Sequence, residues 1–183
     1  MSSEVYKILG PISVVQLWLC LWFMIKKWPG NKTMSYSAHA AATKAGIIYY
    51  LASFSLHLVL FYIFALKWFA PTYGLPSIFL VILFIAELGQ LGALLIPSTG
   101  GRMTLAHDIT AYLMHILLMP LSLFIVFSNN FSMFARLVAV IATSYMVFVW
   151  LTFIKGKLND RHLLLQTIYG LSFHVAILVA AFL

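Results

Sequence analysis

Residues 77–115 read SIFLVILFIAELGQLGALLIPSTGGRMTLAHDITAYLMH, and this stretch decides the fold. It holds two apolar runs, each about as long as a bilayer is thick, since a spanning helix needs about 20 apolar residues. Between the runs, Pro97, Gly100 and Gly101 end one helix and allow the next to begin. A connection this short makes neighbouring helices antiparallel and adjacent, so the stretch predicts a pair of membrane helices packed side by side.

The rest of the chain repeats this pattern. Of its 183 residues, 63% are hydrophobic and 8% are charged, which leaves too little polar surface for a water-soluble globule. We predict an all-α polytopic membrane protein, a bundle of six transmembrane helices that forms a single domain over residues 1–183. The six runs are Ile8 to Ile25, Ala45 to Phe69, Ser77 to Ile96, Thr104 to Ser128, Met133 to Ile154 and Leu163 to Leu183.

The connection before the second run has a helix signal of its own. Ser35 or Ser37 is suited to cap an alanine-rich stretch, Ala38 to Ala45. We therefore expect the second helix to begin early and to lie partly in the membrane interface.

Positive charge is divided unequally between the two sides of the predicted bundle. Of the 11 Lys and Arg residues, eight fall in the connections after helices one, three and five, and three fall on the other side. The positive-inside rule then predicts an integral protein of the cell membrane with both termini outside the cytoplasm. The basic side is expected to meet anionic lipid headgroups. The net charge of +7 is spread over loops and predicts no nucleic-acid partner, while a homo-oligomer stays open.

Every predicted span carries a polar residue near its midpoint. At about 1.5 Å per residue, these positions lie roughly 15 to 18 Å from the cytoplasmic ends of the spans. Ionisable groups at that depth are costly and normally face the bundle interior, where they pair with one another or bind a ligand. The residues are Gln16, His57, Glu87, His115, Tyr145 and His174.

Helical spacing extends this layer into a candidate site. Glu87 and His115 lie on adjacent predicted helices, so we expect a hydrogen bond between them, or a bridge through one water or ligand. Gln90 lies three residues after Glu87, and Asp108 lies seven residues before His115 on the same helical face. That face leads from the cytoplasmic side to the midplane, and it predicts a ligand-binding site or proton relay. His107 and Tyr112 flank it, and Ser53 lies four residues before His57.

The connection between the third and fourth spans offers a second kind of site. Gly100 and Gly101 precede a helix start, where backbone N–H groups can hold a phosphate or lipid headgroup with Arg102 as the counter-ion. The spacing of a P-loop is missing, so a plain connection between helices is the favoured interpretation.

Three classes of function stay open. The favoured class is non-enzymatic, a midplane site open to the cytoplasmic side that binds or transports a small polar ligand, a lipid headgroup or a proton. The second is a b-type cytochrome, in which two of His57, His115 and His174 ligate haem iron while Gly89 and Gly92 leave room for the ring.

The third class is a membrane-embedded zinc hydrolase. The same three histidines would hold the metal, and Glu87 would polarise water. The sequence contains no HExxH or GxSxG signature. Its absence weighs against an enzyme, and neither haem b nor zinc is the favoured cofactor.

A family resemblance rests on the segment ELGQLGALLIPSTGGRMTLAHDITAYLMH, residues 87–115. Its Ile-Pro loop, followed by a histidine at the head of the next helix, resembles prokaryotic six-helix membrane proteins distantly similar to the Frag1/DRAM/Sfk1 group. The matching positions are Pro97 and His107, and the resemblance implies a six-helix membrane fold. The loop that marks the eukaryotic members after the first helix is missing here, so their roles in lipid remodelling or autophagy are not carried over.

Overall fold

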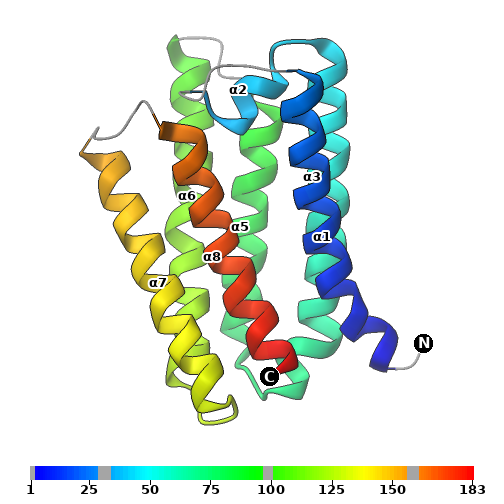
Figure 1. The fold of residues 1–183 in the computed structure, drawn as a ribbon, viewed down its shortest axis with the longest axis vertical. Helices are drawn as coiled ribbons and strands as arrows, with labels where there is room; N and C mark the ends of the chain where they lie inside the picture. Colours follow the sequence, from blue (N-terminus) through cyan, green and yellow to red (C-terminus); the bar gives the residue numbers. More distant parts are fainter. Residues whose placement is uncertain (1–2, 29–33, 97–100, 156–160) are drawn as a thin grey trace.

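The computed structural model describes residues 3–28, 34–96, 101–155 and 161–183. Within these ranges the chain is helical and contains no strand, and Figure 1 shows long helices standing side by side. Six of the described helices are long and apolar enough to cross a membrane. The predicted all-α bundle of six helices is therefore confirmed, and the protein is an integral membrane protein.

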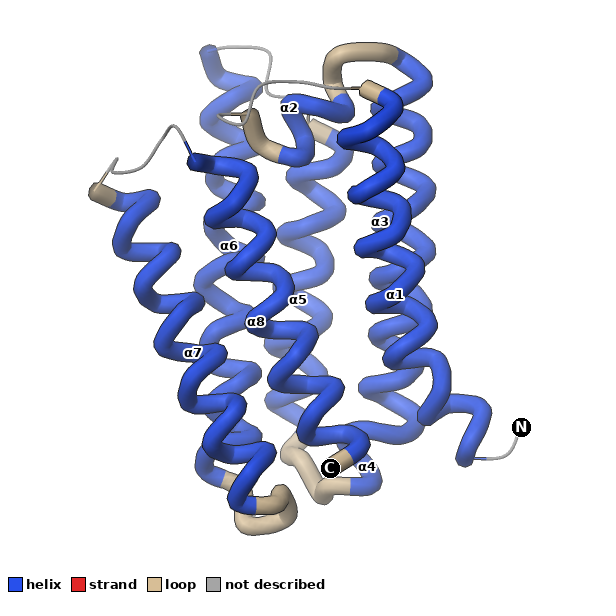
Figure 2. Tube along the Cα trace, in the orientation of Figure 1, coloured by secondary structure: helices blue, strands red, loops and turns tan. Residues whose placement is uncertain are grey.

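Each predicted apolar run overlaps one of the six long helices. These are α1 (Ser3–Lys27), α3 (Lys44–Phe64), α5 (Ser77–Leu95), α6 (Gly101–Phe127), α7 (Met133–Ile154) and α8 (His162–Phe182). α3 continues into a π-helical turn, η1 (Ala65–Phe69), and then into the short α4 (Ala70–Thr72). A five-residue helix, α2 (Tyr36–Ala40), lies across one end of the bundle (Figure 2).

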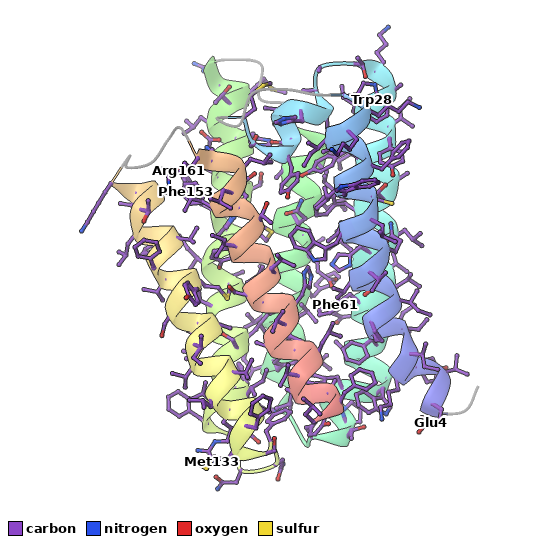
Figure 3. All side chains as sticks on the ribbon, in the orientation of Figure 1. Glu4, Trp28, Phe61, Met133, Phe153 and Arg161 are labelled. Carbon is purple, nitrogen blue, oxygen red and sulfur yellow. The ribbon has the colours of Figure 1, made fainter. Side chains whose placement is uncertain are left out.

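The two ends of the bundle are distinct. α1, α5 and α7 finish at the end where α2 lies, which we call the basic end, and the N- and C-termini lie at the opposite, termini end. Figure 3 shows Trp28 and Arg161 at the basic end and Glu4 and Met133 at the termini end. The side of the membrane that each end faces stays a prediction. The described helix ends and connections at the basic end carry Lys26, Lys27, Lys44, Arg102 and Lys155.

The approach to the second span consists of two helices. Ser35 caps α2, and its hydroxyl oxygen accepts a hydrogen bond from the Ala38 N–H at 3.1 Å. Thr43 caps α3 in the same way, accepting from the Gly46 N–H at 2.9 Å. A Cβ on Gly46 would lie 2.5 Å from the Ala40 carbonyl oxygen, so this close passage requires glycine. The predicted serine cap is confirmed at Ser35, but the predicted early start of the second span is wrong, because Thr43 starts a separate helix.

Successive spans pack as neighbours. The most extensive contacts join α1 to α3, α5 to α6, α6 to α7 and α7 to α8. α5 and α6 lie close together at Gly89, where an added Cβ would lie 3.0 Å from the Thr110 carbonyl oxygen and 3.1 Å from the Met114 nitrogen. Small residues allow such backbone contacts between membrane helices. The predicted adjacency of these two spans is therefore confirmed.

Aromatic side chains fill the interior of the termini end. Phe69 is fully buried, and its ring centroid lies 5.5 Å from that of Phe64, 5.9 Å from Phe79 and 5.8 Å from Phe131. Tyr73 stacks on Phe131 at 4.4 Å. Large rings in contact gain dispersion energy over many atom pairs. This end is a densely packed core, and it leaves the opposite half of the bundle to hold the site.

Candidate functional site

A cavity of about 140 Å³ lies inside the bundle, in the half nearer the basic end. Its described lining comes from α1, α2, α3, α5, α6 and α8, and mixes apolar and aromatic residues with a set of polar ones. Six predicted site residues line it: His57, Glu87, Gln90, His107, His115 and His174. The other polar lining residues are Trp18, Tyr36, Ser37, Tyr50, Gln166 and Tyr169.

Glu87 brings a carboxylate to this cavity. Its side chain is partly buried, and its Oε1 is buried with no hydrogen-bond partner in the described structure. The described lining includes no Lys or Arg that could neutralise it. A charged group at the centre of a membrane costs about 2.5–3.5 kcal/mol or more. The Glu87 oxygen is therefore available to a bound molecule, water or a proton.

His57 on α3 and His174 on α8 meet across the interior, with ring centroids 5.1 Å apart and ring planes nearly perpendicular. The His57 Nδ1 lies 3.1 Å from the Ser13 carbonyl oxygen, so Nδ1 carries the proton and the neutral ring has its lone pair on Nε2. His174 has the opposite arrangement, because the Trp18 Nε1–H donates to its Nδ1 at 3.1 Å. Gly170 allows this contact, since a Cβ there would lie 3.2 Å from the Trp18 ring.

His115 on α6 is held by contacts on both sides of its ring. Its Nδ1 donates to the Ala111 carbonyl oxygen at 2.6 Å, which leaves the Nε2 lone pair of the neutral ring as an acceptor. The ring packs on Tyr169 at 4.6 Å, and the Tyr169 hydroxyl donates to the His115 carbonyl oxygen. His115 and Glu87 share the cavity, but the described structure contains no direct hydrogen bond between them. A bridge through water or a ligand stays a prediction.

α2 lies across the basic end of the bundle (Figure 1), and its residues Tyr36 and Ser37 line the cavity. His107 donates from Nδ1 to the Ile96 carbonyl oxygen at 2.8 Å, so its Nε2 accepts from the Ser37 hydroxyl at 3.2 Å. The Tyr36 N–H donates to the Gln166 Oε1 at 3.1 Å. Burial raises the pKa of the Tyr36 phenol, whose oxygen lies 2.6 Å from the Thr167 hydroxyl oxygen. Polar contacts to α6 and α8 therefore hold α2 in place.

Sequence reasoning did not assign Trp18, Tyr36, Ser37 or Tyr50 to the site. The sequence indicates Ser37 only as a helix cap. Trp18 lies within an apolar span and reaches the site through its indole N–H, which donates to His174. The Ser-Tyr-Ser triplet at 35–37 is the available signal, because serines suited to cap an alanine-rich stretch predict a helix in this connection. His39 is also buried, and its Nδ1 donates to the Ser35 carbonyl oxygen at 3.0 Å.

Gln16 and Ser53 lie between α1 and α3, outside the cavity lining. The Gln16 Nε2 donates to the Ser53 carbonyl oxygen and contacts the Cys20 sulfur, both at 3.3 Å. The Gln16 Oε1 is also buried without a partner in the described structure, but a neutral amide costs far less there than a carboxylate. These residues join two helices, as polar groups in membrane bundles commonly do.

Two of the residues that the sequence analysis places in or beside the site face away from the interior. Tyr112 on α6 is 46% exposed, and Tyr145 on α7 is 55% exposed. Depth along a span does not fix the direction in which a side chain points, and both residues lie on the face of their helix that points away from the bundle. Neither residue lines the cavity.

Asp108 lies in the first turns of α6 but does not line the cavity. It interacts electrostatically with His162, at the start of α8. Of the candidate phosphate loop, Gly100 lies outside the described residues, Gly101 is the first residue of α6 and Arg102 is exposed. A phosphate or headgroup site at this loop therefore stays a prediction.

The cofactor alternatives fit this geometry poorly. Among the described residues, no group of three His, Cys, Asp or Glu side chains is placed to hold a metal ion. The space beside Gly89 and Gly92, expected to admit a haem ring, is filled by Thr110 and Met114 of α6. His57 and His174 contact each other edge to face, and the cavity of about 140 Å³ is smaller than the pockets of about 300–1,000 Å³ that hold large ligands. Neither a zinc centre nor a haem site is supported.

No family model, curated protein or solved structure shows significant similarity to this chain. The resemblance to the Frag1/DRAM/Sfk1 group, carried by Pro97 and His107, therefore stays a prediction. His107 links α2 to the end of α5, so a histidine at this position has a structural role that does not depend on the resemblance. What the structure establishes is an integral membrane bundle of six helices with a cavity that apolar and polar side chains line together.

Proposed function

We propose that this protein binds a small polar molecule in the cavity between α1, α3, α5, α6 and α8 and does not catalyse a reaction. The observation that carries the proposal is the buried Glu87 oxygen without a partner, in a cavity that His57, His115 and His174 also line. A carboxylate kept in a membrane interior is costly and usually serves a ligand, an ion or a proton. Apolar and aromatic walls with a few polar groups between them are the ordinary composition of a binding pocket.

The molecule enters at the basic end, where α2 covers the cavity. α2 has five residues, too few to be stable as an isolated helix. The hydrogen bonds of Tyr36 and Ser37 that hold it are each worth about 1 kcal/mol. Movement of α2 is therefore much less costly than movement of any span.

The basic end faces the cytoplasm in this proposal, because the positive-inside rule favours that orientation. A membrane-impermeant maleimide applied to intact cells tests it on a Cys20→Ala background. We expect Asn129→Cys, at the termini end, to be labelled and Ala42→Cys, at the basic end, to be labelled only after permeabilisation. The reverse pattern would place the cavity entrance on the other side.

Access to the cavity is tested with iodoacetamide, a small neutral thiol reagent, on purified protein in the Cys20→Ala background. Ala111 lines the cavity, so Ala111→Cys is expected to react. Ile116 lies on the same helix but is exposed to lipid or detergent, which makes Ile116→Cys a matched control that is expected to react slowly. Thiolates do not form readily in an apolar environment.

The exposed Ala42→Cys defines the full rate of reaction. An Ala111→Cys thiol as unreactive as Ile116→Cys, with Ala42→Cys reacting normally, would show that small polar molecules do not reach the cavity. The proposed function would then fail.

A further inference from the structure

The hydrogen bonds around the cavity fix which atoms remain for a ligand. His57 and His115 each use Nδ1–H on a backbone carbonyl, of Ser13 and Ala111, so their neutral rings offer Nε2 as an acceptor. The Glu87 carboxylate adds an oxygen that has no partner in the described structure. Three residues from α3, α5 and α6 therefore contribute acceptors to one cavity.

Donors in the described cavity lining are all neutral, including the Gln90 amide and the Tyr50 hydroxyl. His174 accepts from Trp18 at Nδ1, so its Nε2 carries the proton, and Gln166 keeps its amide N–H groups because its oxygen accepts from Tyr36. The Tyr169 hydroxyl donates to the His115 carbonyl oxygen and is not available. No described lining residue is Lys or Arg, so the site carries no fixed positive charge among its described residues.

The walls of the cavity suit a cation with an apolar part. Trp18, Tyr50, Phe54 and Phe61 line it, and the faces of aromatic rings attract cations. Figure 3 shows Phe61 in the interior of the bundle. The volume of about 140 Å³ is roughly ten times what a single water needs, so the cavity has room for several non-hydrogen atoms and not only for a bare ion.

We propose that the cavity selects a small organic ammonium ion, whose N–H groups bind the Glu87 carboxylate and the Nε2 atoms of His57 and His115 while its carbon atoms pack on the aromatic wall. This inference rests on the proposed function, because it names the ligand class of the same cavity.

The charge preference of the cavity is tested at the Ala111→Cys thiol in the Cys20→Ala background. Two methanethiosulfonate reagents of similar size are compared, one aminoethyl and cationic, the other sulfonatoethyl and anionic. Each rate is divided by the rate of the same reagent with 2-mercaptoethanol. We expect the cavity thiol to favour the cationic reagent about ten-fold, and Glu87→Gln to remove most of this preference. Lys44 and Arg102 at the basic end would by themselves favour the anion.

Ligand protection gives a second measurement that does not depend on the Glu87→Gln variant folding. Butylammonium, butanol and butyrate have similar shapes and different charges. At equal concentration, pH and ionic strength, butylammonium is expected to slow alkylation of the Ala111→Cys thiol by iodoacetamide and to raise the Tm of the Cys20→Ala protein, while the other two have no effect.

Two results would overturn the inference. One is a preference of the cavity thiol for the anionic reagent, and the other is protection by butyrate or butanol without protection by butylammonium. Both would leave the proposed function standing, because the cavity would still admit small molecules. A thiol at position 111 that iodoacetamide cannot reach would instead remove the proposed function.

Discussion

The two halves of this bundle consist of similar apolar helices but differ in their interiors: one is packed with aromatic rings and the other contains a cavity. Toward the termini end, Phe64, Phe69, Phe79 and Phe131 pack ring against ring and close the interior. Toward the basic end the helices enclose a cavity with polar groups, covered by the short α2. One half provides the packing that holds the helices together, and the other half gives up packing to make room for a ligand.

This difference shows how a small membrane protein keeps a costly polar site. In lipid, helices associate through close packing, because apolar surface gains little by leaving a lipid environment. The aromatic core supplies that packing, so the cavity half can hold a carboxylate with an unsatisfied oxygen. Stability and function are thus expected to respond to different substitutions.

The largest expected effect is on the aromatic core. Phe69→Ala removes a ring that is fully buried, and it should lower the free energy of unfolding by about 3–5 kcal/mol, because the space left behind cannot be filled by its neighbours. Thermal or denaturant unfolding of the purified protein in detergent measures this loss.

Phe54→Ala is the matched control, since Phe54 is partly buried and already borders the cavity. Its cost should be smaller, about 1–2 kcal/mol, because fewer packing contacts are lost. Equal costs at the two positions would show that the two halves are not packed differently.

A smaller effect is expected at the cover. Ser37→Ala removes the hydroxyl that donates to His107, so α2 loses one hydrogen bond worth about 1 kcal/mol. The population with α2 displaced should rise about five-fold. The rate at which iodoacetamide alkylates Ala111→Cys should rise by the same factor.

Ser144→Ala controls for the loss of a serine hydroxyl elsewhere. Ser144 is exposed on α7, and its hydroxyl donates to the Val140 carbonyl oxygen of the same helix. This control is expected to leave the alkylation rate unchanged. If Ser37→Ala also leaves it unchanged, α2 does not limit access to the cavity.

The smallest expected loss of stability is at the site itself. Glu87→Gln keeps the shape of the side chain and removes its ionisable group, so without ligand the free energy of unfolding should not fall. Unfolding in detergent measures it, with the exposed Glu4→Gln as the reference for a neutral change. A clear loss of stability would mean that the carboxylate is structural and has a partner within the bundle.

The sequence predicted part of the site because the depth of a residue in the membrane follows from its position along a helix. Glu87, His57, His115 and His174 were selected by depth in their spans, and all four line the cavity. Depth also selected Tyr145, which faces outward. The rotation of each helix about its axis decides between these outcomes, and a single apolar span carries little information about that rotation.

Composition and the lengths of the apolar runs therefore determined the fold class, the six spans and the adjacency of α5 and α6, since these follow from the thickness of a bilayer and from short connections. The tertiary structure alone decided which polar groups meet. Trp18 and His174 are 156 residues apart, and Tyr36 and Gln166 are 130 apart, yet their hydrogen bonds set a tautomer and hold α2 in place. Such contacts depend on how separate helices are turned toward one another, and no local pattern in the sequence fixes that arrangement.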